Sequence, residues 1–295
     1  MTTEPTDTDM LIDMLRYRRG EGSRTQKIFC KRFIQPVFGK PDSNGNYVLQ
    51  VGDNPRVAFT AHHDSCHTSE GFQKIFVEDG YAYLHPSCVD TDMVLGAEKS
   101  KKKRSKNKSN CLGADDAVGI WIILNLINAG VEATYCLFAG EECGGIGSLA
   151  MVNSNPDWIN HTDLMVSFDR RGYHDVITRQ SGQECLHENV AREICDQLNN
   201  NPVAVLDYKP SPMGMFTDSA NFIGNIPNCT NFSVGYEFEH TSDEYTDLEF
   251  AESLADALPH LDWEYICDVA RTYPAEPTNR DFGHNSSLWG PGHIL

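Results

Sequence analysis

Carboxylate and imidazole side chains follow several apolar segments of this 295-residue sequence. The segments are 57–61, 135–139, 164–168 and 232–236, and the side chains that follow them are His62, Asp64, Glu141, Glu142, Asp169 and His240. Such groups carry out acid–base chemistry and bind divalent cations. Glu141 and Glu142 are adjacent and have no local cation, so they indicate a bound metal, a shared proton or exposure to solvent.

The spacing of these groups predicts strand–helix–strand repeats. Asp115 stands at the start of a helix expected over 116–128 and lies 26 residues before Glu141, and Glu142 lies 27 residues before Asp169. Both intervals are close to one repeat of about 30 residues. Because functional groups in open α/β sheets lie at the carboxyl ends of the strands, we expect all of them at one edge of a sheet.

Other segments are expected to complete the fold. Helices are predicted over 9–18, 148–152, 188–198 and 247–257, a further strand over 175–179, and a hairpin with strands 47–51 and 56–61. The segment 66–110 interrupts the alternation of strands and helices. It is expected to contain a small β unit over 74–84 and a Lys-rich loop over 99–108. Residues 273–295, rich in Pro and Gly, are expected to be a surface tail.

Composition bounds the class of protein. The formal charge is −18, although residues 99–108 carry seven basic side chains and no acidic ones. An acidic body attracts cations and free amines and argues against nucleic acid as a partner, and the Lys-rich run is more typical of a solvated loop than of a nucleic-acid or nuclear-import patch. Ten cysteines without a Cys-x-x-Cys pair, and no signal-peptide-like or membrane-spanning run, predict a soluble cytoplasmic protein with reduced thiols. Cys66, Cys88 and Cys111 could pair only in an oxidising environment.

The ordered set of motifs resembles a known family. His62-x-Asp64, Gly113-Ala114-Asp115-Asp116, Glu141-Glu142, Asp169 and His240 look like the ligand set of the co-catalytic di-zinc exopeptidases. That group contains bacterial leucyl aminopeptidase and, more distantly, peptidase T and the carboxypeptidase G type enzymes. The resemblance covers about residues 45 to 260. The chain departs from the family in its long insert after His62, in Asp169-Arg170-Arg171, and in the acidic residues around His240.

The resemblance implies a fold and a metal centre. The fold would be a three-layer α/β/α sandwich with a mixed, mostly parallel central sheet, and the whole of 1–295 would form a single catalytic domain, because the interval from Asp169 to His240 leaves no room for a separate dimerisation domain. Two divalent ions, most simply Zn²⁺ with Mn²⁺ or Co²⁺ as alternatives, would be bound. The implied ligands are Asp115 as the bridge, His62 and Asp169 on one metal, and Glu142 and His240 on the other.

The resemblance also implies the roles of neighbouring residues. Asp64 would orient His62 by accepting a hydrogen bond from its imidazole, and Glu141 would be the general base for the attacking water. The bond between Asp115 and Asp116 would be cis. Near the site, Tyr236 could donate to the oxyanion, and Asp218 belongs to a polar cluster that lies close to the site in the family.

The substrate is expected to be a peptide or a small amide. An aminopeptidase is the first hypothesis, and a dipeptidase or carboxypeptidase and an N-acyl amidohydrolase are the alternatives. Arg170 or Arg171 could bind a substrate carboxylate, or both could neutralise neighbouring acids. Nothing in the sequence indicates an oligomeric state.

The sequence also permits three rival interpretations. Gly145-x-Gly147-x-x-Ala150 fits a dinucleotide-binding pattern, although Glu141 and Glu142 would repel a pyrophosphate there. His62, His63 and His67 could form a local metal cluster. A non-catalytic relative could keep the fold for binding alone, but such proteins typically lose ligands, whereas this chain retains the base and all five.

Overall fold

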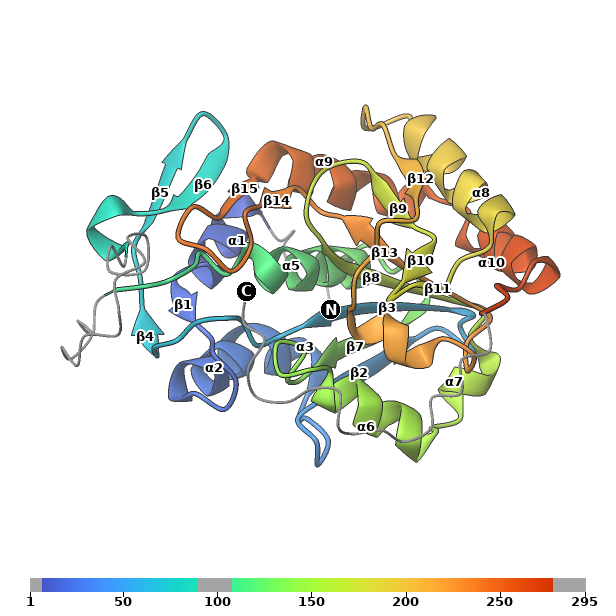
Figure 1. Cartoon of the computed structure of the whole chain (residues 1–295), viewed down its shortest axis with the longest axis horizontal. Coiled ribbons are helices and arrows are strands. Elements are labelled where there is room, and N and C mark those ends of the chain that lie inside the picture. The colour runs from blue at the N-terminus through green and yellow to red at the C-terminus, as the bar shows by residue number, and fades with distance from the viewer. Residues whose placement is uncertain (1–6, 90–107, 278–295) are drawn as a thin grey trace.

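A seven-stranded mixed sheet is the centre of the computed structural model, which describes residues 7–89 and 108–277 (Figure 1). The strand order is β12-β9-β13-β8-β3-β7-β2. Its strands are β2 (Tyr47–Val51), β3 (Val57–His62), β7 (Ala133–Phe138), β8 (Leu164–Arg170), β9 (Asp175–Ile177), β12 (Lys209–Ser211) and β13 (Asn228–Ser233). The four middle strands β13, β8, β3 and β7 are parallel, whereas β2 is antiparallel to β7 and β9 is antiparallel to β13. The predicted mixed, mostly parallel sheet is confirmed.

The expected hairpin between the first two strands of this sheet is wrong. Both strands form, but β7 lies between them, parallel to β3 and antiparallel to β2. Every residue of β7 is buried. A strand that is apolar on both faces is stabilised best inside a sheet, with a neighbour on each side. The five-residue connection 52–56 can span up to about 16 Å, enough to cross one intervening strand at a spacing of about 4.8 Å.

Helices cover both faces of the sheet. The main ones are α1 (Thr8–Met14), α5 (Ala114–Asn128), α6 (Ile146–Ser154), α7 (Trp158–His161), α8 (Glu188–Asn199), α9 (Leu248–Ala257) and α10 (Trp263–Thr272). The chain crosses from β3 to β7 through α5 and returns from β7 to β8, on the other side of β3, through α6 and α7. Because parallel crossovers are right-handed, this reversal places α5 and α6 on opposite faces. Figure 1 shows α1, α5 and α9 on one side and α6 and α7 on the other, which gives the predicted three layers.

A second, four-stranded sheet has the order β14-β15-β6-β5. Its strands are β5 (Ile75–Glu78), β6 (Tyr81–Leu84), β14 (Tyr236–Glu237) and β15 (Tyr245–Asp247). The hairpin of β5 and β6 is the small β unit predicted inside the insert 66–110. The strand predicted over 232–236 is wrong in its bounds, because β13 ends at Ser233 and Tyr236 belongs to this second sheet. A turn through Val234 and Gly235, whose φ is 88°, separates the two.

Several shorter elements differ from expectation. The helix predicted over 9–18 ends at Met14, and Tyr17–Arg18 forms β1, which pairs with β4 (Gly71–Phe72). Three helical segments follow that the sequence pattern did not reveal, namely α2 (Arg24–Phe29), a π-helix (Cys30–Ile34) and α3 (Gln35–Phe38). The two-residue strands β10 (Arg179–Gln180) and β11 (Gln183–Glu184) form a separate hairpin.

Two predicted segments fall largely on residues that the structure does not describe. The Lys-rich loop 99–108 lies outside the described residues except for Lys108, and the tail 273–295 does so beyond residue 277. Within the described ranges 7–89 and 108–277, no helix is long and apolar enough to span a bilayer.

Candidate metal centre

The central sheet brings the predicted metal ligands to one edge. His62 is the last residue of β3, and Asp169 is the penultimate residue of β8. Glu142 is the fourth residue after the end of β7. These three strands are neighbours, and β3 is where the chain reverses its direction across the sheet. A crevice at such a switch point is the usual binding site in an open α/β sheet.

Asp115 lies between the two histidines. Its Oδ1 atom is 2.8 Å from His62 Nε2, and its Oδ2 atom is 3.0 Å from His240 Nε2. On the first side, His62 Nε2 is also 3.5 Å from Asp169 Oδ1. On the second side, His240 Nε2 is 3.2 Å from Glu142 Oε2. All five predicted ligands are therefore together, and Asp115 offers one oxygen to each side.

The donor atoms form two compact groups. The first group is His62, Asp115 and Asp169, and the second is Cys66, Glu142 and His240; within each group the candidate ligand atoms lie within 4.8 Å of one another. Ligands about 2.0–2.1 Å from a tetrahedral zinc ion are about 3.3 Å apart. The measured separations of 2.8–3.5 Å among the nitrogen and oxygen atoms bracket that value. The residues present therefore fit a pair of divalent cations.

Electrostatics at this edge also fit a bound cation. Burial and the charge of Asp169 raise the pKa values of Asp116 and Glu141 well above the ordinary range. Burial opposes ionisation of Asp115, but hydrogen bonds from His240 and His62 outweigh it and lower its pKa. Oε1 of Glu142 is buried and has no hydrogen-bond partner among the described residues. Carboxylates crowded in this way favour a nearby positive charge.

Asp64 is fixed by main-chain amides and also lies beside the imidazole of His62. Its carboxylate accepts hydrogen bonds of 3.0–3.2 Å from the backbone N–H groups of Gly140, Glu141 and Glu142. Nδ1 of His62 is 3.5 Å from Asp64 Oδ1, which is longer than a normal hydrogen bond. Asp64 therefore holds the glutamate loop in place beside His62 and has a wider structural role than the one predicted.

Asp169 is held by three side chains. Its Oδ2 accepts a hydrogen bond of 2.6 Å from Thr217, and its Oδ1 accepts one of 3.1 Å from the hydroxyl of Tyr236. Asn231 bonds to both the backbone N–H and the carbonyl of Asp169. Tyr236 is buried, and its hydroxyl fixes the position of the predicted ligand Asp169.

Glu141 and Asp218 lie in the same acidic environment. Glu141 lies in the loop fixed by Asp64 and is close enough to Asp169 and His62 for their charges to act on its pKa. Asp218 lies in a 3₁₀ helix, Asp218–Phe222, and burial raises its pKa to about 8. Neither of its carboxyl oxygens has a hydrogen-bond partner in the part of the chain that the structure describes. A buried carboxyl in this state favours its neutral form.

Arg170 and Arg171 already pair with acids. Arg170 donates from Nε and Nη2 to Asp175 Oδ2 at 3.1 Å, and Arg171 Nη1 is 2.9 Å from Glu239 Oε1. These contacts favour the neutralising interpretation of the two arginines over the binding of a substrate carboxylate.

Glu244 is a site residue that the sequence did not reveal. Its buried carboxylate accepts hydrogen bonds from the backbone N–H groups of Leu112, Gly113 and Asp115 at 2.8–3.1 Å. It therefore clamps the loop that carries Asp115. No local pattern marks it, because its partners lie about 130 residues earlier in the chain.

A buried polar network lies behind the same loop. The guanidinium of Arg19 donates to the carbonyl of Gly113 at 3.1 Å. The backbone N–H of Arg19 donates to Nδ1 of His67. His67 Nε2 lies 3.2 Å from Gln73 Oε1. Burial and the charge of Arg19 lower the pKa of His67 to about 3, so its imidazole is neutral. His63 bonds to Gly45 and Gln26, so the idea of a local His62, His63 and His67 metal cluster is not supported.

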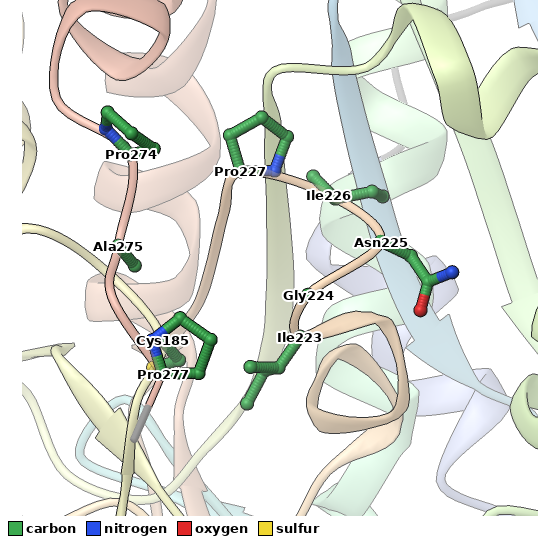
Figure 2. A pocket seen from close by; sticks show the side chains of 9 residues that line it. All are labelled: Cys185, Ile223, Gly224, Asn225, Ile226, Pro227, Pro274, Ala275 and Pro277. Atoms are coloured by element: carbon green, nitrogen blue, oxygen red, sulfur yellow. The ribbon is translucent and has the colours of Figure 1, made fainter. Parts of the chain in front are cut away.

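The dinucleotide-like segment has the right context, but the N–H groups of its glycine turn are already bonded. It follows β7 and opens α6. However, the N–H groups of Ile146 and Gly147 bond to the carbonyls of Gly140 and Ala139, so they cannot bind a phosphate. A separate pocket, lined by residues including Cys185, Pro227 and Pro274, lies at the amino end of β13 and has no acidic or histidine lining (Figure 2). Neither feature competes with the acidic edge as the candidate site.

The fold is similar to that of several solved enzymes. A tripeptidase from Staphylococcus aureus matches with a TM-score of 0.58 at 14% identity, over 90% of this chain and 98% of that chain. A TET aminopeptidase from a marine sediment archaeon matches with a TM-score of 0.58 at 11% identity, over 89% and 99%. A protein from Thermotoga maritima described as an endoglucanase matches with a TM-score of 0.55 at 11% identity, over 88% and 99%. No protein-family model and no curated protein matches the sequence.

These comparisons define the fold. The chain shares the three-layer α/β/α fold of these proteins along nearly its whole length, which is the fold that the resemblance of its motifs implied.

Replacing Glu244 by Gln should loosen the loop that carries Asp115. The amide retains one acceptor oxygen for three N–H donors, so at least one buried donor is left unpaired, at a cost of about 1–3 kcal/mol in unfolding free energy. Urea unfolding and a divalent-metal titration should show lower stability and weaker binding. Asp243→Asn, an exposed neighbour with the same change in charge, should change neither. Wild-type behaviour of Glu244→Gln would contradict the clamp.

The buried His67 should make stability fall in acid. Its folded pKa of about 3 lies below the unfolded value of 6.5, so its contribution is complete above pH 6.5 and is lost as the pH falls toward 3. Between pH 7 and pH 5 the loss should be about 2 kcal/mol. Unfolding of metal-free protein measured at both pH values should show this extra loss in the wild type and in exposed His161→Gln, but not in His67→Gln. An equal loss in all three would contradict the assignment.

Proposed function

We propose that the chain is a di-metal-dependent exopeptidase, most simply an aminopeptidase. The observation that carries the proposal is the position of Asp115, whose two carboxylate oxygens face His62 and His240 separately at 2.8 and 3.0 Å. A carboxylate between two ligand groups is the arrangement that a two-metal hydrolase requires.

The ligand assignment follows the two groups of donors. His62 and Asp169 would hold one cation, Glu142 and His240 would hold the other, and Asp115 would contact both. When bound, such cations polarise a substrate carbonyl and make water more acidic. We propose Zn²⁺, because imidazole and carboxylate donors suit it, with Mn²⁺ and Co²⁺ as alternatives.

Glu141 is the proposed general base. Its carboxylate accepts a proton from the attacking water and later donates that proton to the leaving nitrogen. Burial and the charge of Asp169 raise the pKa of Glu141, and a raised pKa favours proton uptake by a carboxylate. Asp64 supports this role by fixing the backbone N–H groups of Glu141 and Glu142.

The preference for a free amine is supported by charge. The chain is strongly acidic, with a formal charge of −18, and an acidic body attracts the amino end of a peptide. Arg170 and Arg171 are paired with Asp175 and Glu239, which disfavours their use as a carboxylate clamp. A tripeptidase and an aminopeptidase are among the structures that share the fold. A dipeptidase or carboxypeptidase, an N-acyl amidohydrolase and a non-catalytic binding protein remain the alternatives.

The proposal also includes the organisation and location of the protein. The second sheet supplies Tyr236 and carries the loop with His240, so neither sheet makes the site alone, which supports one catalytic unit. All ten cysteines are free, which supports a reducing, cytoplasmic location.

Glu141→Gln should abolish turnover while leaving metal binding intact. Loss of a general base typically costs about 10²–10⁴-fold in rate. Peptide hydrolysis and metal content should be measured together, with Glu132→Gln as a control because this exposed glutamate precedes the opposite end of the same strand β7. Unchanged turnover in Glu141→Gln would remove it as the base. A wild-type protein that binds two cations but hydrolyses nothing would establish the non-catalytic alternative.

The end of the peptide that is recognised can be tested with three forms of one tripeptide. Acetylation of the amino end should prevent hydrolysis, whereas amidation of the carboxyl end should be tolerated, because the proposed site selects a free amine. Released amino acids should be followed by chromatography. Loss of hydrolysis on amidation would identify a dipeptidase or carboxypeptidase instead, and a requirement for the acetyl group would identify an amidohydrolase.

A further inference from the structure

A thiol belongs to one of the two ligand groups. Cys66 lies in the loop after β3, four residues beyond His62, and its Sγ atom is 2.7 Å from Glu142 Oε2. Sγ of Cys66, an Oε atom of Glu142 and a ring nitrogen of His240 all lie within 4.8 Å of one another. Among the residues that the structure describes, the group around His62 contains only nitrogen and oxygen donors. The two halves of the centre therefore differ in chemistry.

A second observation at this group points to a ligand. The side chain of Glu142 is 8% exposed, and its Oε1 atom is buried without a hydrogen-bond partner among the described residues. A buried carboxylate oxygen that no donor satisfies is costly unless a cation or solvent compensates it. The same carboxylate contacts Cys66 and His240 through its other oxygen.

We propose that Cys66 is a thiolate ligand of the cation held by Glu142 and His240, so that this half of the centre prefers thiophilic ions. The inference rests on the metal centre of the proposed function and deepens it. On binding, the S–H bond breaks, a sulfur–metal bond forms and the proton passes to solvent, with no change in oxidation state.

The two halves of the centre differ in the number of donor atoms that they offer to a cation. Cys66, Glu142, His240 and the Oδ2 atom of Asp115 offer four donors, the number found in closed zinc sites. His62, Asp169 and the Oδ1 atom of Asp115 offer three. Thiolate favours zinc and other soft ions, whereas the other half, with carboxylates and one imidazole, also suits harder ions such as Mn²⁺. The competing explanation is a neutral thiol that only donates a hydrogen bond to Glu142.

Cobalt substitution separates these explanations. The full chain should be freed of metal with a chelator, dialysed and loaded with two equivalents of Co²⁺, and its near-ultraviolet absorption recorded. Thiolate-to-cobalt charge transfer should appear in the wild type and in Cys143→Ser, which replaces an exposed thiol beside Glu142, and should be absent in Cys66→Ser. A spectrum without this band in wild-type protein that holds two Co²⁺ would overturn the proposal, as would a band that persists in Cys66→Ser.

Cadmium affinity provides a second readout. Replacing a residue that only hydrogen-bonds to a metal ligand typically lowers metal affinity by about 10–100-fold. Loss of a direct ligand should therefore weaken Cd²⁺ binding at one of the two sites by at least about tenfold. Calorimetric titration of Cys66→Ser should show this loss at one site only. Equal affinities in Cys66→Ser and the wild type would contradict thiolate ligation.

A measurement on protein with Cys66 intact guards against a variant that fails to fold. Zinc X-ray absorption on Cys143→Ser loaded with two equivalents of Zn²⁺ should detect sulfur at about 2.3 Å from the metal. A first shell of nitrogen and oxygen alone would overturn the proposal.

These outcomes can be told apart from failure of the proposed function. A protein that binds two cations and hydrolyses peptides but lacks metal–sulfur bonds loses only the role of Cys66. A protein with the metal–sulfur bond but no hydrolysis retains that role and loses the exopeptidase assignment. A protein that binds no divalent ion loses both.

Discussion

Repulsion among buried carboxylates is the constraint on which the rest of this site depends. Asp115, Asp116 and Asp169 gather at one sheet edge, and burial together with their mutual repulsion opposes ionisation of Asp116 and Asp169. Such a group is stable only where positive charge or hydrogen-bond donors compensate it. Two histidines supply part of this compensation, and the backbone N–H groups of His62 and Gly119 supply another part by donating hydrogen bonds to Asp116. The carboxylates of Asp64 and Glu244 accept hydrogen bonds from other backbone N–H groups and so fix the loops that carry the predicted ligands.

The insert that departs from the resembled family has a structural purpose. Its hairpin, β5 and β6, pairs with β15, and β15 pairs with β14, so the insert completes the sheet from which the loop 238–244 projects. That loop brings His240 to the carboxylate of Asp115 and Glu244 to the backbone N–H of Asp115. The segment that departs from the family in sequence therefore helps to position His240 and Glu244.

The sequence predicted those parts of the fold that depend on local pattern. Apolar runs and their spacing were enough to place His62 and Asp169 at strand ends, because register in a parallel sheet brings the carboxyl ends together. The pairing of β2 with β7 could not be read from local turns, since turn residues are compatible with more than one partner strand. Glu244 was missed because its function depends on contacts about 130 residues away. The helix α10 did carry a signal, with Asp262 as its N-cap and apolar residues at helical spacing.

The two histidines are held by different means, and this difference explains the complexity of the loop around His240. His62 is the last residue of a buried strand, so the pairing of β3 with β7 fixes its backbone. His240 lies on a loop with its side chain 51% exposed, and its φ of 66°, like that of Phe238 at 57°, is left-handed. That conformation costs about 1–2 kcal/mol for each residue that is not glycine. Such conformations persist where the surroundings enforce them. Here the β14–β15 pairing and the three hydrogen bonds of Glu244 provide that enforcement, so the backbone cost is borne in the loop that places His240 beside Asp115.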